Sequence, residues 1–505
     1  MLGLPLVAAI IPFVVKGRTQ LWGWTTIVFS FVALLISTVL AVGLGSERVL
    51  IANAPWIYLD ALSIYFILLV NLVVFVASWF INGFLMHKQQ NNTRHNPRQF
   101  HFFFNLFHLT MLAVPMVRNL VFLWIAVELT TVFSTILVGY RGDRKALEAA
   151  WKYIIITTTG IIFALLGTLF LANAIQPDLL QSATDPLDWS WLATPNIAGK
   201  LDQTFVKLSF LFVLVGYGTK AGFAPMHTWL PDGHGEAPFP VSALLSGVLL
   251  KSALYALLRF YTITKLALAQ SGTNFLPASW LIVGLFSLGL ATPFILKENR
   301  FKRILAYHSL EHMGIIAFGV GIGSSLALFG VLLHALNHAL TKALMFLTYG
   351  HVRQIYATQS PNGQISDEDV KGVLSSLPYS GVLLMLGGLA LVGVPPFNIF
   401  MSEFIILWAA LAKPFTWMSL FAVSAFLITV TIIFAGLVRH LSRVILGKPP
   451  FALMLESKIS LAPLLLLIGV ILIFGVVIPT VPIDFSQLLN QSVNIIMEGS
   501  VVLQK

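Results

Sequence analysis

Apolar runs of about twenty residues recur along this chain of 505 residues, and they constrain its fold more than any single motif does. A run of that length crosses a bilayer as a helix. The composition agrees, since 57% of the residues are hydrophobic, 10% are charged and the mean hydropathy is +0.88. The runs predict an all-α polytopic membrane protein with about fourteen transmembrane helices.

Loops on alternate sides of these expected spans differ in charge. With the N-terminus outside, the inner loops hold far more Lys and Arg than the outer loops, which predicts that both termini face outward. The same loops explain the net charge of +10, so nucleic acid is not expected as a partner. The first apolar run, 2–15, has no basic segment before it and no cleavage site after it, and we expect a retained helix. The predicted location is a bacterial inner (cytoplasmic) membrane.

Two lysines interrupt apolar spans between Gly216 and Phe260. A lysine in mid-membrane costs about 2.5–3.5 kcal/mol on insertion scales, so Lys220 and Lys251 each require a purpose or a partner. Pro225 is expected to break the helix about one turn after Lys220, and His227 follows the break. An ionisable group beside a helix break is typical of transport sites, although His227 could also be a satisfied core histidine.

A carboxylate and two rows of histidines lie in other apolar spans. Glu128 is near the middle of FLWIAVELTTVFSTILVGY; beside a lysine it could stay ionised, or it could form a purely structural ion pair. His308 and His312 are spaced i, i+4 with Glu311 between them, and His334, His338 and Lys342 share one helix face. Such rows suit either a wire of titratable groups or a metal site. Zinc would need a third strong ligand and would be opposed by the nearby lysine, so no metal is expected.

A second interrupted span mirrors the first. Pro395 and Pro396 break GGLALVGVPPFNIFMSEFIILWAA, and Glu403 follows the break by about two turns. Paired interrupted spans of this kind indicate two inverted repeats. We therefore expect N-terminal helices in 1–100 (about three spans) and a first repeat in 101–270 (about five spans). A second repeat is expected in 271–446 (about five spans), followed in 447–505 by a last span and a short tail.

The stretch GTKAGFAPMHTWLPDGHGEAPFPVSALLSG resembles the antiporter-like proton-translocating subunits of respiratory complex I, Mrp-type sodium/proton antiporters and membrane-bound hydrogenases. Its ending, PFPVSALLSG, and the later LAYHSLEHMG are most similar to the F subunit of hydrogenase-4-type enzymes. The resemblance covers roughly residues 55–450. It implies that Glu128 faces Lys220 and that Lys251 is the central proton carrier. Relatives carry either Lys or Glu at the position of Glu403.

The resemblance implies a proton-translocating subunit of a redox-driven complex, either hydrogenase-4-like or NADH dehydrogenase-like. The alternatives are a proton- or sodium-coupled component of an Mrp-type antiporter or of a two-component inorganic carbon uptake system, and a membrane anchor whose charges are only structural. The chain has no cysteine and no supported nucleotide motif, so we expect no cofactor, and redox chemistry is assigned to partner subunits. The expected proton path comprises Glu128, Lys220, His227, Lys251, His308, His312, His334, His338, Lys342 and Glu403.

Overall fold

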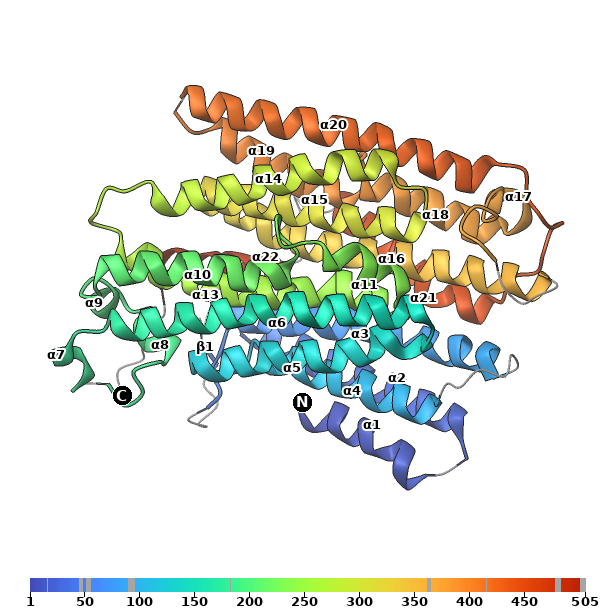
Figure 1. Cartoon of the computed structure of the whole chain (residues 1–505), viewed down its shortest axis with the longest axis horizontal. Coiled ribbons are helices and arrows are strands. Elements are labelled where there is room, and N and C mark those ends of the chain that lie inside the picture. Colours follow the sequence, from blue (N-terminus) through green and yellow to red (C-terminus); the bar gives the residue numbers. More distant parts are fainter. Residues whose placement is uncertain are drawn as a thin grey trace.

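The computed structural model describes residues 1–15, 17–44, 49–50, 56–89, 96–181, 183–360, 365–414, 416–476 and 483–499. In this part of the chain the long helices run side by side along the longest axis of the molecule (Figure 1). Nine of them are long and apolar enough to cross a membrane. The shorter apolar helices are Gly3–Val14, Pro378–Leu391, Asn398–Leu411 and Ser460–Val476. The all-α polytopic class is confirmed, and the helices on either side of Pro225 and of Pro395–Pro396 are separate, as the two expected breaks require.

Four helices and a short hairpin begin the chain. They are α1 (Gly3–Val14), α2 (Thr19–Gly43), β1 (Val49–Leu50), β2 (Leu59–Asp60), α3 (Ala61–Gln89) and α4 (Pro97–Ala113). The two strands pair antiparallel just before α3. Asp60 caps that helix, because its Oδ1 accepts a hydrogen bond of 2.8 Å from the backbone N–H of Ser63.

The next segment contains the first interrupted span. Its elements are α5 (Leu120–Val138), η1 (Gly139–Arg141), α6 (Arg144–Asn173), α7 (Pro177–Leu180), α8 (Trp189–Leu192), α9 (Pro195–Ala198), α10 (Gln203–Ala221), α11 (Trp229–Glu236), α12 (Phe239–Leu244), η2 (Leu245–Leu249) and α13 (Leu250–Ala267). The η2 segment is π-helical and joins α12 and α13 into one continuous span. The three short helices α7, α8 and α9 lie together at one end of the bundle (Figure 1).

The second interrupted span lies in the following segment. Its elements are α14 (Phe275–Lys297), α15 (Phe301–Ile322), α16 (Ser325–Gln359), α17 (Val373–Ser376), α18 (Pro378–Leu391), α19 (Asn398–Leu411) and α20 (Trp417–Leu446), followed by α21 (Lys458–Val476) and α22 (Ile483–Glu498). The short tail expected after the last span is therefore largely helical. Helix α22 packs against α3, α13 and α16. Lys265 of α13 binds α22 by donating a hydrogen bond of 2.7 Å to the carbonyl of Met497.

Small residues allow two helix pairs to approach closely. On α6, a Cβ at Gly160 would lie 2.6 Å from Cβ of Thr219 on α10, and on α10 a Cβ at Gly216 would lie 2.4 Å from the backbone nitrogen of Ala164 on α6. In the same way, a Cβ at Gly284 of α14 would lie 2.6 Å from the backbone nitrogen of Phe318 on α15. The glycines thus let the backbones of each helix pair lie in contact, as small residues commonly do in membrane helix bundles.

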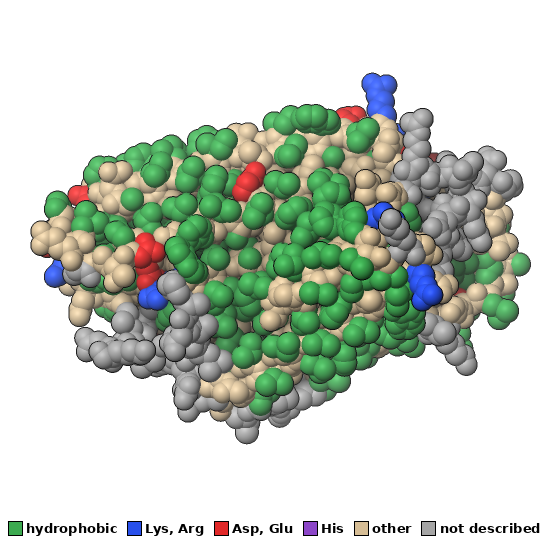
Figure 2. Space-filling view, turned by 90° about the horizontal axis from the view of Figure 1, so that it is seen from below, with side chains coloured by type: hydrophobic (Ala, Val, Ile, Leu, Met, Phe, Trp, Pro, Cys, Tyr) green, Lys and Arg blue, Asp and Glu red, His purple; other side chains and the backbone are tan. Residues whose placement is uncertain are grey.

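Burial separates a central group of helices from an outer ring. The most apolar window of the span Phe239–Ala267 is 100% buried inside the molecule and that of α16 is 94% buried, whereas that of α2 is 28% buried. Hydrophobic side chains cover most of the face shown in Figure 2, and the charged side chains seen on that face lie mainly toward its two ends. This pattern fits a lipid-facing belt around a protein core. Polar groups on the central helices are therefore shielded from lipid.

Candidate functional site

A threonine hydroxyl connects the first predicted acid and lysine. Thr131 of α5 donates a hydrogen bond of 3.2 Å to Oε2 of Glu128 and accepts one from Nζ of Lys220, at the end of α10. The same ammonium lies 3.4 Å from the carbonyl of Val127. No ion pair within 4.0 Å joins Glu128 to Lys220 among the described residues. The two groups are therefore coupled through Thr131.

Lys220 and Glu128 differ in how deeply they are buried. Lys220 is fully buried, and its Nζ lies 5.8 Å from the centre of the Tyr153 ring. Glu128 is half-buried between α5 and α6, where its Oε1 accepts a hydrogen bond of 2.8 Å from Thr158. The lysine thus belongs to the interior, while the carboxylate lies nearer the outer ring of helices.

The first helix break directly follows Lys220. Gly222 ends α10 with a φ of 80°, and the chain passes through Pro225 before α11 begins at Trp229. Two side chains form hydrogen bonds with backbone groups at the break. Trp229 Nε1 donates a hydrogen bond of 2.9 Å to the carbonyl of Thr219, and Ser287 Oγ of α14 accepts a hydrogen bond of 3.0 Å from the N–H of Ala224. The break is thus a built feature of the protein interior.

Two histidines follow this break, and only one of them was predicted. His227 lies in the connection to α11, where its ring centre is 6.4 Å from that of Phe294. His234 of α11 is completely buried, and neither ring nitrogen has a hydrogen-bond partner in the described part of the chain. Its ring lies between those of Trp229 at 5.9 Å and Phe346 at 6.0 Å. A histidine in a Gly-rich connection carries no helical periodicity, which is why the pattern did not single it out.

Lys251 begins the second half of the site. It lies just after η2, and its Nζ donates a hydrogen bond of 2.8 Å to the carbonyl of Ser246. The same ammonium contacts Nδ1 of His338 on α16. A π-helical segment leaves backbone carbonyls without their usual partners and often marks functional sites. Here the lysine itself binds one of these carbonyls.

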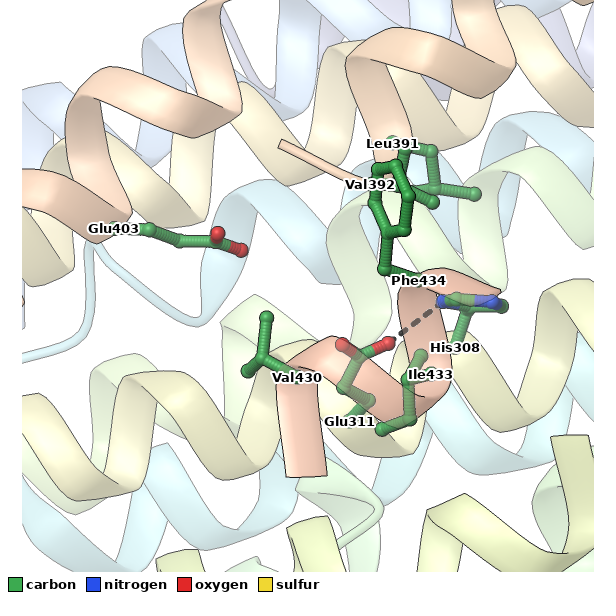
Figure 3. A pocket seen from close by; sticks show the side chains of 8 residues that line it. All are labelled: His308, Glu311, Leu391, Val392, Glu403, Val430, Ile433 and Phe434. Carbon is green, nitrogen blue, oxygen red and sulfur yellow. Dashed lines mark ion pairs between the residues drawn. The ribbon is translucent and has the colours of Figure 1, made fainter. Parts of the chain in front are cut away.

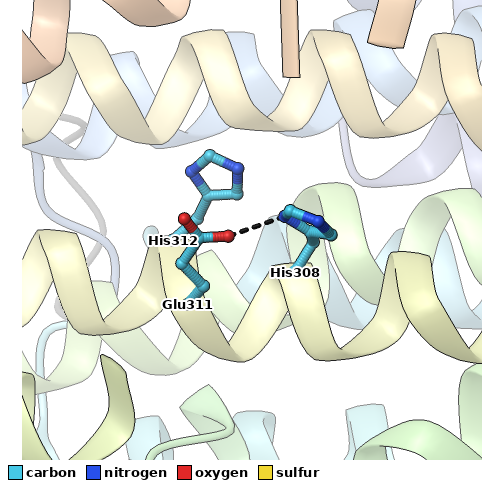
Figure 4. A group of neighbouring side chains, drawn as sticks. All are labelled: His308, Glu311 and His312. Carbon is cyan, nitrogen blue, oxygen red and sulfur yellow. Dashed lines mark ion pairs between the residues drawn. The ribbon is translucent and has the colours of Figure 1, made fainter. Parts of the chain in front are cut away.

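The two predicted histidine rows meet in one buried cluster. His312 of α15 lies with its Nδ1 3.1 Å from Nε2 of His334 on α16, and its ring centre is 4.7 Å from that of His338. His308 Nδ1 forms an ion pair of 2.6 Å with Oε2 of Glu311 (Figure 4). All four imidazoles are at most 1% exposed. The cluster therefore joins α15 to α16.

Lys342 shares the predicted face of α16 with His334 and His338, and it is also completely buried. Its Nζ donates a hydrogen bond of 2.6 Å to the carbonyl of Leu305, one turn before His308 on α15. The three polar groups of this face therefore contact α15 or α13, and His334 also contacts Ser402 of α19.

Glu403 lies beside the second helix break. Helix α18 ends at Leu391 and α19 begins at Asn398, so the break contains both Pro395 and Pro396. Asn337 of α16 donates a hydrogen bond of 2.7 Å to the carbonyl of Asn398, which connects the start of α19 to α16.

The carboxylate of Glu403 points toward this break. Oε2 lies 2.7 Å from the place where a Cβ would stand on Gly393. Together with His308 and Glu311 it lines a pocket whose other walls are apolar (Figure 3).

Ion pairs hold the two ends of this arrangement. At one end, Asp232 and Glu236 of α11 pair with four basic side chains at 3.2–3.5 Å, namely Lys152, Arg303, Arg141 and Arg300. At the other end, Arg259 of α13 pairs with Asp60 at 2.6 Å and its guanidinium lies 3.7 Å from the ring centre of Trp189. Neighbouring Asp188 caps α8, and burial raises its pKa against the effects of Ser190 and Arg118. The sequence pattern did not connect these residues because their partners are far apart in the chain.

A bundle of apolar helices with two breaks and a buried row of Lys, His and Glu defines the class of polytopic membrane subunits that handle ions. Residues 117–429 match the family described as NADH:quinone oxidoreductase/Mrp antiporter, TM. The chain is 35% identical over 398 residues to a hydrogenase-4 component F homolog of Methylacidiphilum infernorum (isolate V4), covering 77% of this chain and 79% of that protein. The chain therefore belongs to this family.

Two solved structures share the fold. One is a chain of the membrane-bound sulfane sulfur reductase, an archaeal respiratory membrane complex, with a TM-score of 0.83, 24% identity and coverage of 99% of this chain and 97% of that chain. The other is a chain of the Mrp complex from Dietzia sp. DQ12-45-1b, with a TM-score of 0.81, 18% identity and coverage of 98% and 96%. Both are subunits of assemblies with several chains, as expected of this fold.

Proposed function

We propose that this chain is the proton-translocating membrane subunit of a redox-driven complex of the hydrogenase-4 or NADH dehydrogenase type. The observation that carries the proposal is the contiguous buried set that runs from Lys251 through His338, His312 and His334 toward Glu403. Similarity to a hydrogenase-4 component supports the assignment to a redox complex. The proposed driving force comes from partner subunits, because moving one proton against 100 mV requires about 2.3 kcal/mol.

In this proposal the proton moves through groups that already touch. Lys251 contacts His338 Nδ1, so deprotonation of the ammonium can hand a proton to that imidazole. His338 Nε2 has no other partner in the described residues and is free to pass the proton on. The neighbouring rings of His312 and His334 then lead to Glu403. On the other side of Lys251, Lys220 would pass a proton to Lys251 when movement at the Pro225 break weakens the link between Lys220 and Glu128. His227 would be an additional relay in this step. Lys342 and His308 lie beside the histidine cluster.

The test is proton uptake by sealed vesicles that contain the assembled complex. We expect Lys251→Met to abolish uptake while assembly persists, because the variant lacks the ammonium that contacts His338 Nδ1. Lys251→Arg should also fail, since arginine hardly ever releases its proton. Normal uptake by a correctly inserted Lys251→Met variant would refute the carrier role.

A second candidate is a component of an Mrp-type antiporter, which the likeness to the Mrp structure favours. The two candidates differ in their partners and in their ions. Subunits that carry iron–sulfur clusters or nickel should co-purify with the chain if it serves a redox complex. Purification with cluster-free membrane subunits only, together with uptake driven by a sodium gradient, would favour the antiporter.

We further propose that the protein lies in a bacterial inner membrane and that 101–270 and 271–446 form two inverted repeats. Each of these segments contains one helix break preceded by a close pair of helices, α6 with α10 in the first and α14 with α15 in the second. The proposed orientation places the basic loops in the cytoplasm, as the positive-inside rule requires.

A further inference from the structure

We propose that His312, His334 and Glu403 form a binding site for Zn²⁺. The three residues come from α15, α16 and α19, and each offers a ligand atom within 4.8 Å of the other two. Zinc would act there as an inhibitor and would not be a cofactor. Its inhibitory effect rests on the proposed proton path, whereas the binding itself does not.

The spacing of the two imidazoles suits a tetrahedral ion. Zinc binds histidine nitrogen at about 2.0–2.1 Å, so two neighbouring ligand nitrogens lie roughly 3.3 Å apart. His312 Nδ1 and His334 Nε2 are 3.1 Å apart in the structure. A small rotation of the His312 ring would also direct its Nε2 inward, and that nitrogen has no partner in the described part of the protein.

A hydrogen-bond chain behind His334 accommodates the tautomer that zinc requires. Ser402 donates its only hydroxyl proton to the carbonyl of Ile399 at 2.9 Å. With that proton used, His334 Nδ1, 3.0 Å from the same oxygen, donates its own proton to Ser402 in the tautomer that zinc needs. Nε2 then carries its lone pair toward His312 Nδ1, 3.1 Å away, where a zinc ion would bind in place of the contact between the two rings. Ligating histidines are usually held by such an outer hydrogen bond.

The charges near the site favour a divalent cation more than the sequence pattern indicated. That pattern lacked a third strong ligand, because Glu403 is far from the histidines in the chain and reaches them only after the second break. Glu311 adds a second carboxylate nearby, and both line the same pocket (Figure 3). Two carboxylates offset the charge of Lys342, which binds a backbone carbonyl of α15.

A competing group shares His312, namely His308, Glu311 and His312. We favour the set with His334 for two reasons. His308 Nδ1 and Glu311 are already paired at 2.6 Å (Figure 4), so zinc would have to replace an existing ion pair. The competing set also lies on a single helix, whereas the proposed set gathers ligands from three.

The test is a zinc titration of the purified full-length protein in detergent, followed by competition against a chromophoric chelator. We expect one tight site in the wild type. His334→Ala and Glu403→Gln should each weaken binding at least tenfold, and Ser402→Ala about tenfold through loss of the outer hydrogen bond. The matched control is His308→Ala, which should bind zinc as the wild type does. X-ray absorption at the zinc edge should show two imidazoles and a carboxylate oxygen.

Three results would overturn the proposal: no tight site in the wild type, equal affinity in all variants, or loss of binding in His308→Ala with retention in His334→Ala. The absorption spectrum of the wild type does not depend on whether any variant folds. Because the titration needs no proton gradient, it is independent of the vesicle test. Tight binding with the expected pattern alongside normal uptake by Lys251→Met would reject the proton path and keep the zinc site.

Discussion

At the scale of single residues, the hydroxyl of Thr131 decides how Glu128 and Lys220 influence each other. It donates to the carboxylate and accepts from the ammonium, so a change in the position of either group is felt by the other. A direct ion pair would fix the two charges together. In a bridged pair, Lys220 can move away from Glu128 by losing its hydrogen bond to the neutral Thr131 hydroxyl. This suits a lysine that must alternately hold and release a proton.

We predict that Thr131→Val slows proton uptake about tenfold or more, because hydrogen bonds to charged groups contribute about 1.5–3 kcal/mol each. Valine has nearly the shape of threonine, so the packing of α5 should persist. Thr131→Ser keeps the hydroxyl and should retain most of the activity. Rates would be measured in vesicles at matched expression. Equal rates in the Val and Ser variants would show that the bridge has no part in transport.

The sequence indicated most of the charged residues but not how they are connected. Lys220, Lys251, Glu128 and Glu403 are conspicuous because a charge in an apolar run is costly. Thr131 and Ser402 are not, since hydroxyl residues are common in membrane helices and satisfy themselves on their own backbone. Their roles depend on contacts between helices, which no local pattern contains.

At the scale of elements, both helix breaks are supported from outside. Trp229 and Ser287 satisfy the backbone around Pro225, and Asn337 connects the start of α19 to α16. Proline in an apolar run was sufficient to locate both breaks. The π-helical η2 was not predictable in the same way, because LSGVL contains no residue that forces that geometry. Its position next to Lys251 emerges only from packing.

We predict that Gly222→Ala destabilises the protein and impairs transport. The φ of 80° costs a residue with a side chain about 1–2 kcal/mol, and its Cβ would lie 2.5 Å from Cδ1 of Leu230. The matched control is Gly289→Ala in α14, where a Cβ would meet no atom within 4 Å. Thermal unfolding in detergent and proton uptake would both be measured. A stable, active Gly222→Ala protein would contradict this account of the break.

At the scale of the whole molecule, the absence of cysteine provides a direct test of orientation. Asn299 and Asn196 are both exposed, at the basic end and at the opposite end of the bundle. In intact cells, a membrane-impermeant maleimide should label Asn196→Cys but not Asn299→Cys. After the cells are opened, both variants should react. The reverse pattern in intact cells would invert the proposed topology. The class of protein was predictable from hydropathy alone, whereas the contacts that hold one span against another were not.

The packing of α22 has a consequence for how the protein is made. Thr262 and Lys265 of α13 bind carbonyls of α22 that lie 234 and 232 residues later in the chain. A ribosome adds about 5–20 residues per second, so α13 waits on the order of ten to fifty seconds for this neighbour. During that interval the helix that carries Lys251 has an uncovered side within the membrane.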